Sequence, residues 1–160
     1  MRRKIVFSLL ITVLLTAAPL AEAQQPAKMF RIGVLTGSSL SSQLARNEAF
    51  RQGLRELGYV EGKDILIEWR SYEGNRERQR AFADELVRLK VDVIVAVGSG
   101  DIQTAKETTS TIPIVMMVGG DPVASGFIAS LARPGGNITG LATLRPELSG
   151  KRLELLKEIV

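Results

Sequence analysis

Residues 91–97 form an apolar run that would be buried on both faces of any sheet containing it. The segment reads Val-Asp-Val-Ile-Val-Ala-Val, and only Asp92 interrupts its apolar residues. Such a strand is typical of a parallel sheet, because helices cover both of its faces. Other short apolar segments alternate with helix-like patterns along the chain. The sequence therefore predicts an α/β fold with a doubly wound parallel sheet of about five strands.

The other strands and helices follow from the same alternation. Strands are expected at 30–36, 64–72, 91–97, 112–118 and 138–143. The second of these alternates apolar and polar residues, which favours a position at an edge of the sheet. Helices are expected over 101–109 and 148–160, and a further helix would carry Val123, Phe127 and Leu131 on one side.

Two further helices have recognisable start and stop signals. Ser41 and Ser42 can cap a helix that runs to about Leu57, with Phe50, Leu54 and Leu57 on one face and Gly58 as its stop. Asn75 can cap the next helix, in which Phe82, Leu86 and Leu89 recur at helical spacing.

The first 23 residues have the pattern of a secretory signal peptide. Arg2, Arg3 and Lys4 precede an apolar run, and Ala21-Glu22-Ala23 offers the small residues that a signal peptidase accepts. The run is shorter than the roughly 20 residues of a membrane span, although an uncleaved anchor remains the alternative. Because no cysteine follows it, a lipid anchor is excluded. We expect a protein free in the periplasm.

Composition narrows the classes of function. The chain has no cysteine and no histidine, which excludes disulfides, thiol nucleophiles and zinc–thiolate sites and removes the usual general base. Its formal net charge of +4 is spread without a basic stripe, and aromatic residues make up only 5%. Nucleic-acid binding therefore has little support. A carboxylate-based enzyme remains open, with Asp101 and Asp121 as its only well-placed acids.

Polar loops follow three of the predicted strands, at 37–42, 98–101 and 119–122. In a parallel sheet these loops share one edge, where ligands of α/β folds bind. The pattern Gly98-Ser99-Gly100 starts a dinucleotide motif, but residue 103 is glutamine. Helix capping by Ser42, Ser99 and Asp101 is a second interpretation. The third is a surface that holds a small solute through hydroxyls and backbone amides.

Individual side chains near these loops allow two interpretations each. Asp121 can pair with a ligand ammonium, or it can cap the turn that Asp121-Pro122 begins. Trp69 and Tyr72 can stack on a ligand, or they can cover the edge of the sheet.

The segment 116–140, Met-Met-Val-Gly-Gly-Asp-Pro-Val-Ala-Ser-Gly-Phe-Ile-Ala-Ser-Leu-Ala-Arg-Pro-Gly-Gly-Asn-Ile-Thr-Gly, resembles a signature of ABC-transporter substrate-binding proteins, as do 50–62 and 108–115. The resemblance implies a two-lobed, type I-like periplasmic binding protein whose N-terminal lobe is flavodoxin-like. It closes on a solute and delivers it to a membrane permease driven by an ATPase. Some members bind aromatic amino acids. No cofactor and no nucleic acid are implied.

The resemblance also implies a domain plan and a set of ligand contacts. Residues 1–23 would be the signal peptide, 24–146 the N-terminal lobe, and 147–160 a helix leading toward a hinge and a missing C-terminal lobe. A lone lobe would bind solute weakly or not at all. The alternatives are a sensory ligand-binding domain and the exported enzyme. The implied contacts follow the first, third and fourth strands and are Ser38, Ser39, Ser99, Gly100, Asp121 and Pro122.

Overall fold

The computed structural model describes residues 28–117, 120–141, 150 and 154–158. The predicted signal peptide at 1–23 lies outside the described residues. So do Val118 at the end of the fourth predicted strand, the last residues of the fifth, and most of the predicted helix at 148–160. Among the described residues, no helix has the length and apolar character needed to cross a membrane.

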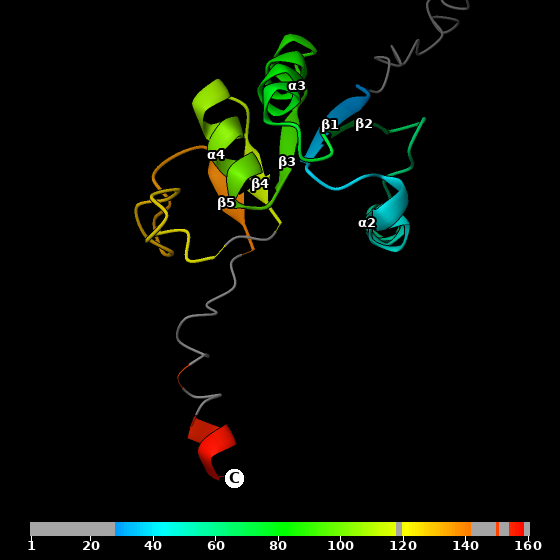
Figure 1. The fold of residues 1–160 in the computed structure, drawn as a ribbon. Helices are drawn as coiled ribbons and strands as arrows, with labels where there is room; N and C mark the ends of the chain where they lie inside the picture. The colour runs from blue at the N-terminus through cyan, green and yellow to red at the C-terminus, as the bar shows by residue number, and fades with distance from the viewer. Residues whose placement is uncertain (1–27, 118–119, 142–149, 151–153, 159–160) are drawn as a thin grey trace, which may run out of the picture.

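Five parallel strands form one sheet in the order β2-β1-β3-β4-β5 (Figure 1). Every neighbouring pair in this sheet is parallel. This is the doubly wound, flavodoxin-like order, and it confirms the fold class predicted from the sequence. The edge position predicted for the second strand is also confirmed. The bounds are β1 Phe30–Thr36, β2 Ile65–Ser71, β3 Val93–Val97, β4 Ile114–Met116 and β5 Ile138–Gly140.

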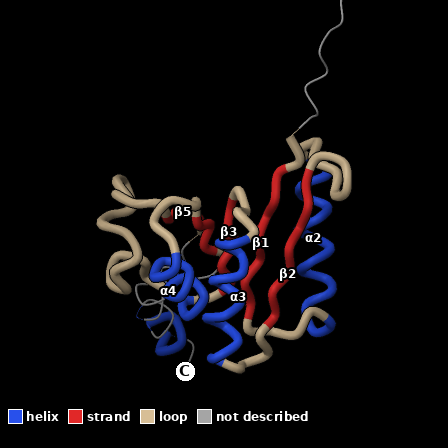
Figure 2. Tube along the Cα trace, turned by 90° about the horizontal axis from the view of Figure 1, so that it is seen from above, coloured by secondary structure: helices blue, strands red, loops and turns tan. Residues whose placement is uncertain are grey.

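Helices cover both faces of the sheet (Figure 2). Helices α3 (Arg76–Arg88) and α4 (Ser99–Thr108) pack on one face. A short 3₁₀ turn, η1 (Ser41–Gln43), leads into α2 (Leu44–Glu56), which packs on the other. Helices fall on opposite faces because right-handed crossovers run outward from β1 in both directions.

Alternate residues of β3 serve the two cores, as the apolar pattern of 91–97 predicts. Ile94 and Ala96 face α3 and α4, whereas Val95 lies in the cluster under α2. On the α3 side, Leu86 is fully buried and rests directly on Gly33 of β1. A Cβ at Gly33 would lie 2.8 Å from Cδ2 of Leu86, so glycine lets the helix approach the strand closely.

The contact of α2 with the sheet uses Phe50 and Leu54. The Phe50 and Trp69 rings meet edge to face, with centroids 6.2 Å apart. Leu57 was expected on the same helix face, but it is 76% exposed. The helix proper ends at Glu56, and Leu57 and Gly58 turn the chain away with Gly58 at a φ of 89°.

The two predicted caps have different outcomes. The Asn75 side chain accepts hydrogen bonds from the N–H groups of Glu77 and Arg78, which confirms it as the cap of α3. The expectation that Ser41 or Ser42 caps α2 is wrong. Both residues lie within η1, and Gln43 precedes α2 without a side-chain capping bond.

The helix predicted through Val123, Phe127 and Leu131 is also wrong, because the chain makes only one helical turn there. The N–H of Phe127 donates to the carbonyl of Pro122, and that of Gly126 donates to Val123. With Gly126 at a φ of 69°, this is the Schellman pattern that ends a helix. Phe127 is buried, but Val123 and Leu131 are exposed.

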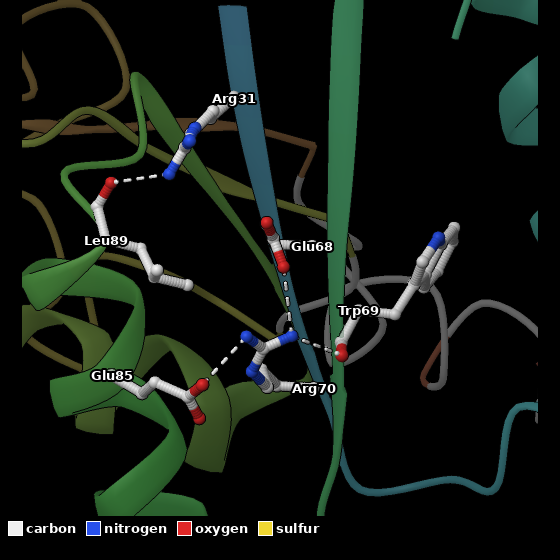
Figure 3. A network of polar contacts seen from close by, with 6 residues as sticks. All are labelled: Arg31, Glu68, Trp69, Arg70, Glu85 and Leu89. Carbon is white, nitrogen blue, oxygen red and sulfur yellow. Dashed lines mark hydrogen bonds and ion pairs between the residues drawn. The ribbon is translucent and has the colours of Figure 1, made fainter. Parts of the chain in front are cut away.

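A polar network fastens the edge strand β2 to α3 (Figure 3). Arg70 donates to Glu85 of α3 at 2.9 Å and to Glu68 of its own strand at 3.2 Å. It also donates to the carbonyl of Trp69 at 3.0 Å. The Arg70 side chain is only 18% exposed, so this network ties β2 to α3 through partly buried, charge-assisted hydrogen bonds.

The described residues of the last predicted helix are 150 and 154–158, and they are helical. Leu155 and Leu156 are both more than half exposed. An apolar helix surface of this kind is one that packs against another element when a partner is present.

Candidate functional site at the carboxyl edge of the sheet

The strand register brings the predicted loops to one edge. Thr36 at the end of β1 pairs with Val97 at the end of β3 and with Ser71 at the end of β2. Met116 at the end of β4 pairs with Ala96. Since all strands are parallel, the residues that follow them emerge side by side. We call this the carboxyl edge.

The hydroxyl groups of Thr36 and Ser71 hydrogen-bond to the backbone of the loop after β1. Thr36 is buried, and its Oγ1 accepts a hydrogen bond from the N–H of Ser38 at 3.3 Å. Ser71 Oγ donates to the carbonyl of Ser38 at 2.8 Å, which ties the loop to the end of β2. Ser39 Oγ accepts from the N–H of Ser42 at 3.2 Å. Ser38 and Ser39 are therefore half-buried and already ordered by neighbours.

The loop after β3 presents free backbone donors. Gly98 has a φ of 108°, a conformation that favours glycine, and it stands at the N-cap position of α4. Ser99 and Gly100 follow and are exposed. Within the described residues no hydrogen bond is recorded from the backbone N–H of either. These two N–H groups are thus available to an anion, with the helix dipole in support.

Asp101 lies beneath this loop rather than at its surface. It is 2% exposed, and Oδ1 accepts a hydrogen bond from Gln79 Nε2 of α3 at 2.9 Å. Burial raises the pKa of Asp101 to about 6, while the hydrogen bonds from Tyr72 and Gln79 act in the opposite direction. The helix-capping role considered for Asp101 and Ser99 is wrong, because Gly98 holds the cap position without a side-chain bond.

Tyr72 joins the ends of β2 and β1 to the first turn of α4. It follows β2 directly, its N–H donates to the carbonyl of Thr36 at 3.1 Å, and its hydroxyl is hydrogen-bonded to Asp101. The hydroxyl crosses the end of β1 so closely that a Cβ at Gly37 would lie 2.7 Å from it. Burial, and then the bond to Asp101, raises the pKa of Tyr72 to about 12. The phenol therefore stays protonated at physiological pH and serves as a fixed donor.

Asp121 lies on the loop after β4 and acts as a capping residue there. Its Oδ1 accepts from the N–H of Val123 at 2.9 Å and of Ala124 at 3.0 Å. The other oxygen has no hydrogen bond recorded within the described residues. Pro122 is fully buried, and its carbonyl accepts from Phe127. That these two residues contact a ligand stays a prediction.

Among the described residues, the carboxyl edge is an open surface with hollows and not an enclosed chamber, and a hollow of about 280 Å³ lies beside Met116 and Gly140 at the ends of β4 and β5. A cavity of about 20 Å³ lies under α2 at this edge, lined by Trp69, Phe50 and Met117 among others. This volume suits one water molecule, which could satisfy the buried and unpaired Nε1 of Trp69. A larger hollow of about 410 Å³ lies at the opposite edge, beside the starts of β1, β2 and β3.

The chemistry of the carboxyl edge is that of holding a polar solute. Within the described residues no three acidic side chains gather into a possible metal site. Asp101 is buried, and Asp121 is occupied by its own turn. No hydrogen bond of the described residues joins the two acids.

Sequence reasoning found the loops but gave too little weight to Tyr72 and did not identify Gln79. The position of Tyr72 directly after β2 is the same signal that selects the other loops. Gln79 carries no such signal, because its role depends on how α3 and α4 pack.

Comparison with known proteins identifies a matching family and a similar relative. A family model described as "ABC transporter substrate binding protein" matches residues 31–160. A tyrosine-binding protein of Clostridioides difficile (strain R20291) is 34% identical over 113 residues, which are 70% of this chain and 32% of that protein. The chain thus spans about a third of the length of this relative.

Two solved structures are similar as well. A conserved domain protein from Vibrio cholerae is 31% identical, with a TM-score of 0.73 over 83% of this chain and 44% of that one. An ABC domain from Streptococcus pneumoniae in complex with L-Trp is 27% identical, with a TM-score of 0.65 over 72% of this chain and 39% of that one.

Proposed function

The chain belongs to the family of ABC transporter substrate binding proteins, and from this premise we propose that its carboxyl edge is one half of a solute-binding cleft. The other half would come from a second lobe supplied by a further part of the protein. Closure of two lobes would enclose the solute and shield it from water. The family consists of substrate-binding proteins and not of enzymes.

One observation carries the proposal. The residues after β1, β3 and β4 emerge at the same edge, and those that the structure describes offer hydroxyls, backbone N–H groups and a carboxylate on an open surface. A ligand held on such a surface alone stays largely in water. Because buried surface and exclusion of water are what make binding tight, the surface needs a second wall.

The groups at the edge match the two charges of an amino acid. The free N–H groups of Ser99 and Gly100, with Ser38 and Ser39 beside them, suit a carboxylate. The unpaired oxygen of Asp121 suits an ammonium group, and Pro122 orders the turn that presents it. The relatives that bind tyrosine and tryptophan make L-tyrosine and L-tryptophan the first solutes to test.

The cellular location that we propose rests on the leader pattern at 1–23. We infer that the leader directs export and is removed after Ala23, so that the protein captures solute in the periplasm. Its partners would be the permease and the ATPase of an ABC import system. A transport role of this kind needs neither a cofactor nor a nucleic acid.

Calorimetric titration tests the proposal. The complete protein should bind L-tyrosine or L-tryptophan, whereas the 160-residue chain should bind the same solute far more weakly. Sub-micromolar binding by the 160-residue chain would contradict the two-lobe account. In the complete protein, Asp121→Ala should lower affinity at least tenfold, since a charge-assisted hydrogen bond contributes roughly 1.5–3 kcal/mol. Unchanged affinity would leave Asp121 as a turn cap only.

A further inference from the structure

Asp101 is the only buried ionisable side chain among the described residues. It lies in the first turn of α4, directly below Ser99 and Gly100. The carboxyl group contacts Gln79 from α3 and Tyr72 from the end of β2. Its partners therefore come from two other elements, and its position is fixed by both.

Among the residues that the structure describes, the neighbours of Asp101 provide hydrogen bonds but no countercharge. The strand ends beside it carry Gly37 and Gly98, and Oδ2 lies 3.9 Å from where a Cβ of Gly98 would stand. On α3, the charge of Arg76 opposes the rise that burial causes in the pKa of Tyr72. Arg80 forms ion pairs with Asp84 and Glu107 at the surface. Burial without a paired cation raises the pKa of Asp101 to about 6, so its charge changes in the range from pH 5 to 7.

An ionisable side chain at this position contributes less to stability than a neutral side chain of the same shape would. An asparagine at this position could hydrogen-bond to both Tyr72 and Gln79 without the cost of burying a charge. A buried acid with a perturbed pKa beneath a binding surface is a candidate functional group.

We propose that Asp101 makes capture of the solute proton-linked, with the protonated acid favouring the solute carboxylate above Ser99 and Gly100. This inference rests on the proposed function of the carboxyl edge. Asp101 does not touch the solute but acts through the loop above it, and is therefore a positioning residue.

The direction in which affinity changes with pH follows from electrostatics. When Asp101 is ionised, its negative charge lies behind the N–H groups of Ser99 and Gly100 and opposes an anion held there. When it is protonated, that opposition disappears, so affinity is higher below pH 6 than above it. By linkage, binding of the carboxylate must then raise the pKa of Asp101, and the complex must take up a proton.

Calorimetry on the complete protein with L-tryptophan and L-tyrosine tests the coupling. Neither solute changes its own charge between pH 5 and pH 7.5. The wild-type protein should bind about threefold to tenfold more tightly at pH 5 than at pH 7.5, with proton uptake near pH 6. Asp101→Asn, which mimics the protonated acid, should show neither the pH dependence nor the uptake.

Two further variants separate coupling from a structural effect. Glu107→Gln removes a charge from the exposed side of α4 and should leave the pH profile unchanged. Tyr72→Phe keeps the acid but removes a hydrogen bond that stabilises its ionised form. Its profile should therefore move to higher pH, which gives a second test if Asp101→Asn does not fold.

The carboxyl carbon signal of Asp101, followed by NMR with and without acetate as an anion probe, tests the coupling independently of the solute. A higher titration midpoint with acetate supports it even if neither amino acid binds, in which case the proposed solute class is wrong. Equal affinity for a bound amino acid at both pH values in the wild type overturns the coupling and leaves the proposed function intact. An acetate-independent midpoint in a protein that binds neither amino acid overturns both.

Discussion

Replacing Gly37 by alanine tests the packing that builds the carboxyl edge. The added Cβ would lie 2.7 Å from the hydroxyl of Tyr72 and 2.9 Å from its Cζ, distances that no real Cβ contact shows. The φ of Gly37 is one that alanine adopts readily, since it falls outside the positive range. The substitution therefore strains this one contact and nothing else in the backbone.

The cost can be estimated from what must move. Tyr72 can shift its ring by a few tenths of an ångström, and overpacking of this kind costs about 1–3 kcal/mol. The shift also weakens the hydrogen bond between Tyr72 and Asp101, which for a charged partner contributes roughly 1.5–3 kcal/mol when fully made. Because the shift is partial, we expect Gly37→Ala to lower the free energy of unfolding by about 2 kcal/mol.

Urea unfolding, followed by the fluorescence of Trp69, measures this change, because the chain has a single tryptophan. In a Tyr72→Ala background the same Gly37→Ala substitution should cost little, since the contact is gone. Gly53→Ala is the matched control. Nothing lies within 4 Å of its added Cβ, and in the middle of α2 it should stabilise by about 0.5–1 kcal/mol. An equal loss from Gly37→Ala with and without the Tyr72 ring would refute the reasoning.

Two other substitutions have expected outcomes of their own. Leu86→Ala should destabilise by about 2–5 kcal/mol in urea unfolding, because it opens a cavity in a fully buried site. Gly33→Ala added to it should recover part of the loss by filling that space. The raised pKa of Asp101 means that its contribution to stability is complete below pH 3.8 and is lost as pH rises through about 6. The stability of Asp101→Asn relative to wild type should therefore rise by about 2 kcal/mol between pH 4 and pH 7, and a difference that does not vary with pH would contradict the burial of the acid.

The fold could be predicted because its signals are local. The apolar run of β3 requires cover on both faces, and the alternation along β2 favours an edge or half-exposed position, so the fold class and the place of β2 could be predicted. Asn75 was identified correctly as a cap, because its side chain and the start of α3 are adjacent in sequence.

The errors arose where a local signal was outweighed by another. Gly126 ends its helical turn through a positive φ, although the spacing of Val123, Phe127 and Leu131 fits a helix. The serines before α2 bond among themselves in a 3₁₀ turn instead of capping.

The candidate site was predictable to the level of loops but not of contacts. Parallel strands place the loops at one edge whatever the side chains are, so their positions follow from chain order. The joining of Tyr72, Asp101 and Gln79 depends on the register of β1 with β2 and on the packing of α3 against α4. Neither of these is encoded by spacing along the chain.

The central claim is that a solute binds at the carboxyl edge. Chemical-shift mapping of backbone amides in the complete protein, titrated with L-tryptophan and then L-tyrosine, tests this most directly. Our account predicts that within this lobe the largest changes fall at 37–39, 98–101 and 121–122. Changes concentrated instead around Phe30, Tyr59 and Val93, which line the hollow at the opposite edge, would contradict it.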